Sequence, residues 1–504
     1  MLVFVALVVA PVVVMGAPAA DKVTSLPGFE DSFDAGLLFE VYSGYLDVDL
    51  TGAGLAYDAL KIHYEFHTCV KSDCPVAVWH QGGPGGSSVY GAWTEMGPFQ
   101  VMASGTVENF ALAWNNVANM LYLESPAGSY ISEDDLSTGW SSCYVSGKKM
   151  GTCEWSDTTQ AVAYARTLAA FYDAFPEFKA NDLYLVGESY AGQYIPNIAT
   201  YLVENPTVLE KNLSGIAVGN GCWGGSENVV VCNGKNAEKH DVEIYYGKGL
   251  ISDKLYDSIV DACGYSFAGA SCSELLVAAE AMIGPYNIYN VYDDCELTSA
   301  AFATNASLRL WYKRFLRAHP HVSKKHAGER LAELAGETYY ASGYPWNCES
   351  DPALDVYFTR DDVLDALHLN ESGSSFSYSE SGPASHLLYP SLVKHMRVLI
   401  YNGDADLCVP YKGNEQWTVA MATDGYVDEL KPWHPWYTNT SAAFHSYAPA
   451  GYATTYTVPD KVYTNTGGND FAFITIRLAG HMVPQYQPKP ALSFFTRFLA
   501  GDTF

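Results

Sequence analysis

Short apolar runs that end in Gly, Pro, Asp or Ser recur along the chain and constrain its fold more than any other feature. Runs of this length and composition predict strands buried on both faces. A helix-like segment from Ser156 to Phe175 starts with Ser and Asp capping residues, carries apolar positions at helical spacing, and stops at Pro176. Strands alternating with helices predict an α/β fold, with a mostly parallel central sheet flanked by helices. The predicted strands are Pro75–Trp79, Met120–Leu123, Leu183–Val186, Ile216–Val218, Val398–Tyr401 and Phe473–Leu478.

The region from Cys222 to about Cys348 differs in character from the rest of the chain. It holds six cysteines, Tyr-rich stretches and helix-like patches such as 326–335, and it lacks a clear buried strand. We interpret it as a disulfide-containing cap inserted into the α/β core. The predicted organisation is a signal peptide over residues 1–20, a first core part over 21–221, the insertion over 222–350 and a second core part over 351–504.

The N-terminal sequence is an uninterrupted apolar run that ends in small residues. Ala17-Pro18-Ala19 is similar to an A-x-A cleavage site, which predicts a signal peptide cut near Ala20. A membrane anchor is the alternative; it is disfavoured because the run is barely long enough for a bilayer and is broken by Pro11. We therefore expect the secretory pathway, with a vacuolar, lysosomal or extracellular destination.

The cysteines fit an exported protein that contains disulfides. Eleven are present, so ten can pair and one is left over. No C-x2-C pair or matching histidine cluster appears, so we predict neither a metal site nor a cofactor. The cysteines fall into two close pairs, six in the insertion, and one more: Cys69 with Cys74, Cys143 with Cys153, those from Cys222 to Cys348, and Cys408. Candidate glycosylation sites are the sequon residues Asn212, Asn305, Asn370 and Asn439.

The charge balance is strongly acidic, with a formal net charge of -28. So much negative charge disfavours binding to nucleic acid or to anionic membranes, so neither is an expected partner, and no membrane contact is expected after signal cleavage. Self-repulsion of this size is relieved where carboxylates are partly protonated. An acidic compartment would suit the chain.

Ser189 lies on a predicted sharp turn after a buried strand, with small residues two positions before and two after it. This is the nucleophile-elbow pattern, in which only small side chains fit a strained and crowded backbone. Gly187 is the first small residue, but Ala191 replaces the second glycine of G-x-S-x-G. The pattern alone is therefore weak, and an ordinary turn is the alternative.

Two later strand ends supply the remaining members of a Ser, acid, His order. The strand Val398–Tyr401 runs into Asp404 and Asp406, and the last predicted strand runs into His481. Each residue alone would be better explained as a polar turn or as an ordinary core or surface histidine. Together, in this order, they favour a catalytic triad.

Five segments resemble serine carboxypeptidases in family order. GESYAGQYIP, YNGDADLCVPYKGN and LAGHMVPQYQP are similar to the three active-site segments, while WHQGGPGGSS and EMGPF are similar to the oxyanion and substrate-carboxylate segments. The likeness covers most of Pro27 to Phe504. It implies the α/β-hydrolase fold and a carboxypeptidase that cleaves peptides or proteins with a free C-terminus.

The resemblance assigns catalytic roles. Ser189 becomes the nucleophile, His481 the general base and then acid, and Asp406, rather than Asp404, the residue that orients the imidazole. The backbone N–H groups of Gly83 and Tyr190 become the oxyanion hole. A phosphate-binding loop is the other use of such glycines, but no Lys-Ser/Thr follows.

The resemblance also assigns binding of the substrate's terminal carboxylate to Gln81, Glu95 and Glu188. Two acids hold an anion only if at least one is protonated, because a neutral carboxyl donates a hydrogen bond whereas ionised carboxyls repel the substrate. Activity should therefore favour acidic pH. Gln81 departs from the Asn usual in the family by one methylene, and Gly86 replaces a customary cysteine.

Four further residues take roles by the same resemblance. Tyr90, Thr94 and Met482 occupy positions that line the pocket for the departing C-terminal residue, the S1' pocket. Cys408 lies where the family often carries a thiol near the active site, and it is our candidate for the cysteine outside the disulfides.

Two rival functions remain open. A serine carboxypeptidase-like acyltransferase would use the same triad, but such enzymes tend to have Asp where Glu188 stands. A catalytically silent binding homologue is the second rival, and the intact triad, elbow and oxyanion loop argue against it. Either a monomer or a homodimer is compatible with the sequence.

Overall fold

The computed structural model describes residues 17–29, 33, 37–102, 104–130, 139–226, 229–232, 234–264, 270–283, 286–292, 352–438, 448–464 and 469–504. Residues 1–16 of the expected signal peptide and the helix-like patch at 326–335 lie outside this part of the chain. So do the sequon residues Asn305 and Asn439.

Six parallel strands form the centre of the sheet. Each predicted buried run coincides with one of them, so the expected α/β architecture is confirmed. Val78 and Trp79 are neighbours in β3 and face opposite sides, which places them in separate hydrophobic cores. In spatial order the strands are β18 (Phe471–Ile476), β15 (Arg397–Gly403), β11 (Gly215–Gly219), β10 (Leu183–Glu188), β3 (Val76–His80) and β6 (Asn119–Leu123).

Antiparallel strands extend both sides of this centre and make the whole sheet mixed. The sequence did not predict them, because they are short or carry polar and apolar residues together. The outermost strand, β16 (Asp428–Trp436), contains Pro432 and Pro435, which suits an edge where one row of backbone donors has no partner strand. The others are β17 (Gly451–Thr457), β2 (Ala59–His67), β1 (Val41–Asp49), β7 (Ser142–Val145) and β8 (Lys148–Lys149).

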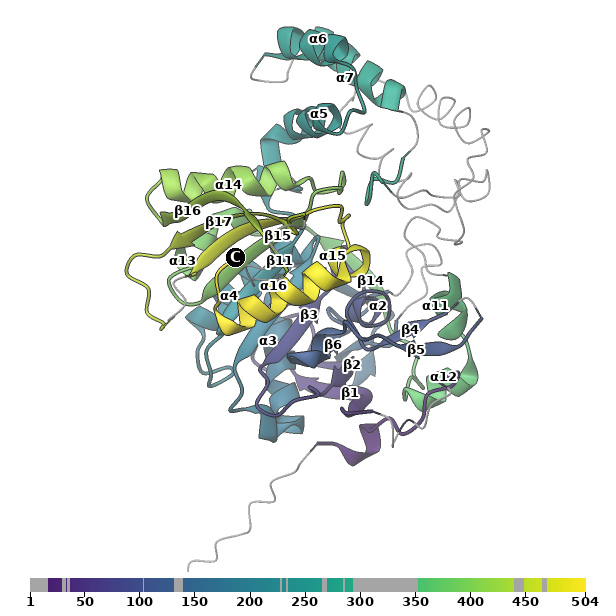
Figure 1. The fold of residues 1–504 in the computed structure, drawn as a ribbon. Coiled ribbons are helices and arrows are strands. Elements are labelled where there is room, and N and C mark those ends of the chain that lie inside the picture. Colours follow the sequence, from purple (N-terminus) through teal and green to yellow (C-terminus); the bar gives the residue numbers. More distant parts are fainter. Residues whose placement is uncertain are drawn as a thin grey trace, which may run out of the picture.

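The predicted helix is confirmed as α3 (Asp157–Ala174). Ser156 caps its N-terminus by accepting a hydrogen bond from the Thr159 N–H, and Thr159 returns a bond to the cap in a capping box. Helices α3 and α4 (Ala191–Glu204) cover one face of the sheet, and α2 (Ser88–Thr94) and α16 (Pro488–Ala500) cover the other (Figure 1). The site described below lies at the carboxyl ends of the parallel strands.

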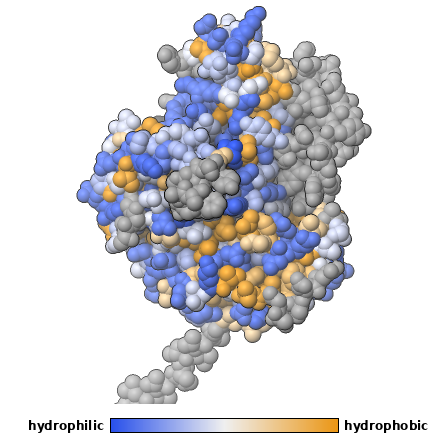
Figure 2. All heavy atoms as spheres, viewed as in Figure 1, coloured by the Kyte–Doolittle hydropathy of each residue, from blue (hydrophilic) through white to orange (hydrophobic). Residues whose placement is uncertain are grey.

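The described residues of the expected insertion form mainly helices, and their small hydrophobic core also includes Leu407 from the loop after β15. Helices α5 (Ala237–Gly247), α6 (Asp253–Cys263) and α7 (Ala270–Ile283) extend from the sheet beyond α14 (Tyr411–Thr423) (Figure 1). On the visible face, hydrophobic and hydrophilic residues alternate over these helices (Figure 2). The disulfides are Cys69–Cys74, Cys143–Cys153, Cys222–Cys232 and Cys263–Cys272, while Cys295 and Cys348 fall outside the described residues.

The remaining elements are short. None of the helices in the described ranges is long and apolar enough to cross a bilayer. The remaining short elements are β4 (Phe99–Val101), β5 (Val107–Asn109), β9 (Thr152–Ser156), β12 (Gly224–Ser226), β13 (Val229–Val231), β14 (Ser375–Ser379), α11 (Pro352–Tyr357), α12 (Asp361–Ala366), α13 (Tyr389–Leu392) and α15 (Val483–Tyr486).

Candidate active site

The candidate site residues follow the carboxyl ends of five neighbouring parallel strands. In open α/β sheets, loops at this edge converge and form binding sites. One residue follows each strand: Gln81 after β3, Ser189 after β10, Asn220 after β11, Asp406 in the loop after β15, and His481 in the loop after β18.

Ser189 has the strained backbone expected of an elbow. Its φ is 61°, in the left-handed region, and its N–H donates to the Gly219 carbonyl at 2.9 Å. A Cβ on Gly187 would lie 2.3 Å from the His80 carbonyl oxygen, so no larger residue fits two positions before the serine. A Cβ on Gly82 would lie 2.5 Å from the Ser189 Cβ. These close approaches explain why glycines surround the turn.

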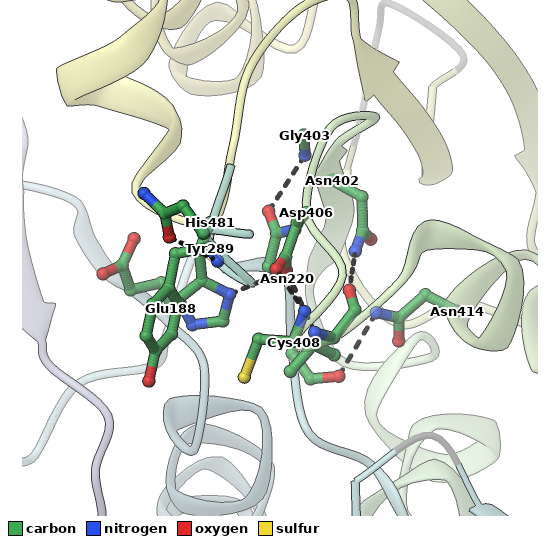
Figure 3. Close-up of polar contacts among 12 residues, drawn as sticks. Glu188, Asn220, Tyr289, Asn402, Gly403, Asp406, Cys408, Asn414 and His481 are labelled. Atoms are coloured by element: carbon green, nitrogen blue, oxygen red, sulfur yellow. Dashed lines mark hydrogen bonds and ion pairs between the residues drawn. The ribbon is translucent and has the colours of Figure 1, made fainter. Parts of the chain in front are cut away.

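His481 is held by Asp406 on one side of its ring. Its Nδ1 lies 2.7 Å from Asp406 Oδ2, and because a carboxylate only accepts, Nδ1 carries the proton. Three further donors bind the same carboxylate: Asn220 Nδ2 at 2.7 Å, the Val409 N–H at 3.1 Å and the Cys408 N–H at 2.8 Å (Figure 3). Asp406 is fully buried. The structure thus joins His481 to Asp406.

Asp404 has a different position. Its carboxylate accepts from the Leu478 N–H at 2.8 Å and lies 3.6 Å from the Lys248 ammonium. It therefore stabilises the turn between β18 and His481 rather than the imidazole.

The other ring nitrogen, His481 Nε2, is buried and has no hydrogen-bond partner among the described residues, so Ser189 is not hydrogen-bonded to it in this structure. The Tyr289 ring packs edge-on against the imidazole, with centroids 5.0 Å apart, and the Tyr289 carbonyl accepts from the His481 N–H at 2.7 Å (Figure 3). The histidine is therefore fixed in place with Nε2 left for a further partner.

The glycine loop after β3 packs against the elbow. A Cβ on Gly82 would also lie 2.7 Å from the Tyr190 N, which shows that this backbone lies beside the start of α4. The Gly86 N–H donates to the Gly82 carbonyl at 3.0 Å and so orients the peptide plane that carries the Gly83 N–H. Gly83 itself has a φ of 112°, which favours glycine. Gly82, which directly precedes Gly83, thus borders Ser189 and the Tyr190 N–H, as an oxyanion hole built from the Gly83 and Tyr190 N–H groups requires.

The three residues expected to bind a carboxylate form one buried cluster. Gln81 Nε2 donates to Glu188 Oε1 at 2.8 Å and to Glu95 Oε1 at 3.3 Å. Trp79 Nε1 donates to Gln81 Oε1 at 2.7 Å and so fixes which end of the amide faces the acids. Glu95 and Glu188 are 2% and 1% exposed. Residues from β3, α2 and β10 therefore meet at one point beside the nucleophile.

Burial controls the charge of this cluster. It raises the pKa of Glu95 to about 8, against the opposing effect of hydrogen bonds from Gln81 and Glu188. Burial, together with repulsion from Glu95, raises the pKa of Glu188 well above its usual value. Two buried carboxyls this close repel each other when both are ionised, which favours a proton on one of them. At acidic pH the cluster therefore offers a neutral carboxyl and an amide.

Gln81 fits because glycines surround it. A Cβ at position 86 would lie 3.2 Å from Gln81 Cγ, and a Cβ at position 91 would lie 2.9 Å from Gln81 Oε1. The longer Gln81 and the absence of a side chain at Gly86 are therefore physically linked. Both departures from the family pattern occur in the same small space.

The other predicted residues are placed as follows. Tyr90 and Thr94 lie on α2 one turn apart, where the Thr94 hydroxyl donates to the Tyr90 carbonyl, and Met482 directly follows His481. Cys408 carries a thiol and is partly buried. Asn212 and Asn370 are exposed. In the described part of the chain, no group of three or more His, Cys, Asp or Glu side chains could hold a metal ion.

Sequence reasoning missed three residues of this site. Trp79 lies in a buried strand as predicted, but no sequence pattern shows that its indole N–H donates to Gln81. Asn220 could have been found, because a polar residue directly after a parallel strand lies at the functional edge. Tyr289 lies in the expected insertion, where no local sequence pattern distinguishes it from the other tyrosines.

Comparison with known proteins gives a consistent result. The serine carboxypeptidase family model matches residues 27–501. Serine carboxypeptidase-like 20 of Arabidopsis thaliana is 29% identical over 533 residues, covering 97% of this chain and 95% of that protein. The lysosomal protective protein of Mus musculus is 29% identical over 514 residues, covering 97% and 95%. A solved prohormone-processing carboxypeptidase from Saccharomyces cerevisiae has a TM-score of 0.61 at 18% identity, over 96% of both chains, and supports the fold.

Proposed function

Because the chain belongs to the serine carboxypeptidase family, we propose that it releases C-terminal residues from peptides and proteins through an acyl-enzyme formed on Ser189. The observation that carries the proposal is the cluster of Gln81, Glu95 and Glu188, which borders the elbow and suits a terminal carboxylate. An endopeptidase would have no use for a protonated acid pair at this position.

The reaction uses the geometry around His481. Ser189 Oγ attacks the carbonyl carbon of the last peptide bond while His481 Nε2 accepts the hydroxyl proton. The C–N bond breaks, the imidazolium protonates the leaving amine, and the acyl group stays on Ser189 as an ester. Water then attacks the ester with His481 again as base, the ester C–O bond breaks, and the imidazolium returns its proton to Ser189 Oγ as the product acid leaves. Asp406 keeps the proton on Nδ1, so Nε2 has a free lone pair with which it can accept the serine proton.

The oxygen of the tetrahedral intermediate carries a negative charge that needs donors already in place. The Gly83 and Tyr190 N–H groups border Ser189 and serve as these donors. Their planes are held by the Gly86 N–H and by the start of α4. Little reorganisation is needed when the charge develops.

Recognition of the substrate's C-terminus depends on the proton that one carboxyl of the Glu95 and Glu188 pair keeps. A neutral carboxyl of the Glu95 and Glu188 pair and the Gln81 amide donate to the substrate's terminal carboxylate. Below the raised pKa of the pair this donor is present. As pH rises through that pKa, the neutral carboxyl loses its proton, and the resulting carboxylate repels the substrate. Peptidase activity should therefore persist from acidic pH up to the raised pKa, about 8 for Glu95, and fall above it.

We also propose that the protein is exported through the secretory pathway. Cleavage of the signal peptide near Ala20 and delivery to a vacuolar, lysosomal or extracellular destination fit the four disulfides. Glycans on Asn212 and Asn370 are supported by the exposure of both side chains. N-terminal sequencing of the secreted protein and glycosidase digestion test these points.

The central test uses blocked dipeptides with a free C-terminus. We expect hydrolysis that is faster below the raised pKa of the glutamate pair than above it and that is abolished by a serine-directed fluorophosphonate, with the label found on Ser189 by mass spectrometry. The same dipeptides with an amidated C-terminus are the matched control and should be poor substrates. Equal cleavage of both forms would contradict a carboxypeptidase, and a label on another serine would contradict the assigned nucleophile.

A further inference from the structure

His80, which the reaction above does not use, is a buried histidine at the end of β3. It is 1% exposed and lies directly before Gln81. Its Nδ1 is 2.7 Å from the Gln81 carbonyl oxygen, and because a carbonyl only accepts, Nδ1 carries the proton. Its Nε2 is 2.8 Å from Gln160 Nε2, and an amide nitrogen only donates, so Nε2 is the acceptor. These two contacts define one tautomer of a neutral ring.

The ring is also confined from both faces. Tyr164 of α3 stacks on it with centroids 4.9 Å apart, and Tyr194 of α4 stacks on it at 4.5 Å. Burial lowers the pKa of His80 to about 4, so the neutral form persists in a mildly acidic solution. The imidazole is therefore an immobile donor aimed at the carbonyl of Gln81.

The other side of the proposed oxyanion hole is held from the same helix turn. Asp157, the first residue of α3, accepts from the Tyr190 hydroxyl at 3.1 Å. The same carboxylate accepts from the Tyr378 hydroxyl at 2.8 Å and from the Ser381 N–H at 2.6 Å. Asp157 and Gln160 are three residues apart, so they lie on one face of the helix.

We infer that the first turn of α3 positions both halves of the oxyanion hole: Gln160 acts through His80 on the Gln81 peptide, and Asp157 acts through Tyr190. This inference rests on the proposed function. His80, Gln160 and Asp157 are positioning residues, since none is placed to touch substrate. The Gln81–Gly82 peptide plane, held by His80, continues directly into the Gly82–Gly83 plane, held by Gly86. Two successive planes of the loop are thus oriented by hydrogen bonds.

The competing explanation is that His80 only fills space between two tyrosines. A space-filling residue in a dry apolar slot would be replaced well by leucine and poorly by a polar residue. A positioning residue would show the opposite order, because Asn places an amide N–H close to where the histidine Nδ1–H lies, whereas Leu has no donor. The two explanations therefore predict opposite rankings.

The experiment compares His80→Asn with His80→Leu. For His80→Leu we expect kcat to fall on the order of 100-fold with both a peptide substrate and an ester of the same acyl group, because both need the oxyanion hole. His80→Asn should keep at least ten times more activity than His80→Leu. Equal activities, or a more active Leu variant, would overturn the inference. Thermal melts of both variants show what fraction is folded.

A second pair keeps the test valid if the His80 variants fail to fold. In Gln160→Glu, the new carboxyl either donates to Nε2 or accepts from it, and Nδ1–H stays on Gln81 in both cases. Gln160→Met has similar length but leaves Nε2 buried without a donor. We expect Gln160→Glu to retain several-fold more kcat than Gln160→Met; the reverse order would contradict the inference. His434→Leu is the matched control, since His434 also binds a carbonyl through Nδ1 but lies on the edge strand β16.

One readout does not depend on catalysis. Nitrogen NMR of labelled imidazole should show His80 as the Nδ1–H tautomer in the wild type, and an Nε2–H tautomer would refute the inference even if the protein cleaves peptides. Conversely, a wild type that cleaves no peptide or ester while His80 shows the expected tautomer would contradict the proposed function and leave the geometry of the positioning contacts intact.

Discussion

Two buried carboxyl sites lie at the same edge of the sheet and differ in how many donors they receive. Asp406 accepts from four groups: the His481 imidazole, the Asn220 amide and two backbone N–H groups. The pair of Glu95 and Glu188 receives a single amide, that of Gln81. Both sites are almost completely buried.

Because both sites are equally buried, the difference in their chemistry comes from the number of hydrogen-bond donors that each acid receives. Four charge-assisted bonds stabilise Asp406 as a carboxylate, which lets it hold the imidazolium that forms during the reaction. Glu95 and Glu188 have only the Gln81 amide as a donor among the described residues, which is too few to stabilise two negative charges. One carboxyl therefore keeps its proton and can itself donate a hydrogen bond. In the proposed reaction, one site stabilises a cation and the other binds an anion, although both are built from acids.

The largest expected effect comes from removing the charge at the site with many donors. Asp406→Asn should lower kcat about 10⁴-fold, because the amide favours the wrong imidazole tautomer. Initial rates with blocked dipeptides measure this. Asp404→Asn is the matched control and should stay near wild-type activity, with a loss of about 1 kcal/mol in stability from the weakened turn bond to Leu478. Comparable losses in both variants would contradict the assignment of Asp406.

The next effect comes from making this site resemble the glutamate pair. Asn220→Asp removes one donor from Asp406 and places a second carboxyl beside it. The two acids should then share a proton at low pH and repel each other as pH rises, so the variant should be active only toward acidic pH. Asn220→Ala, which lacks the charge, should lower kcat about ten-fold at all pH values. A pH profile of Asn220→Asp that parallels wild type would contradict the claim that the number of donors determines the protonation of these buried acids.

A smaller effect is expected when the glutamate pair loses an acid. Glu188→Gln supplies an amide that donates at any pH, so the fall of peptidase kcat/KM at high pH should move upward by about one pH unit or more. The wild-type fall follows from the raised pKa of both glutamates: the donor exists below that pKa and is lost above it. Ester hydrolysis, which needs no terminal carboxylate, should be unchanged. An unaltered peptide profile would count against the role of Glu188.

The smallest effect concerns the room around Gln81. In Gly86→Ala the new Cβ would lie 3.2 Å from Gln81 Cγ, so the amide must shift and KM for peptides should rise about three- to ten-fold. Shortening the neighbour in a Gly86→Ala, Gln81→Asn double variant should recover part of this loss. Gly151→Ala is the control, since no atom lies within 4 Å of its added Cβ. Additive effects of the two changes would show that they are independent.

The parallel centre of the fold was predictable because strands buried on both faces have nearly uninterrupted apolar sequences. The flanking antiparallel strands were not, since β1 and β16 mix polar and apolar residues and depend on their neighbours for identity. The helix α3 was predictable from its capping box and from Pro176. In the region expected to be an insertion, the helices α5, α6 and α7 were not predicted.

The candidate site was predictable where a residue type and a strand end coincide. Ser189, Asp406 and His481 follow strands in the expected order, and the structure joins the last two. Trp79 could not be predicted, because its indole looks like core and reaches Gln81 only through its edge. His80 and Gln160 are 80 positions apart, and no local sequence pattern predicts the hydrogen bond between them.

What the sequence by itself determined is the local chemistry: strands that end in turns, a serine in a tight elbow, and glycines where backbones must approach. What only the tertiary structure decided is which atoms meet. Gln81 contacts an acid 107 residues away, and Asn220 contacts one 186 residues away. The physical reason is that protonation depends on burial and donor count, and both are set by the packing of distant segments rather than by neighbours in the chain.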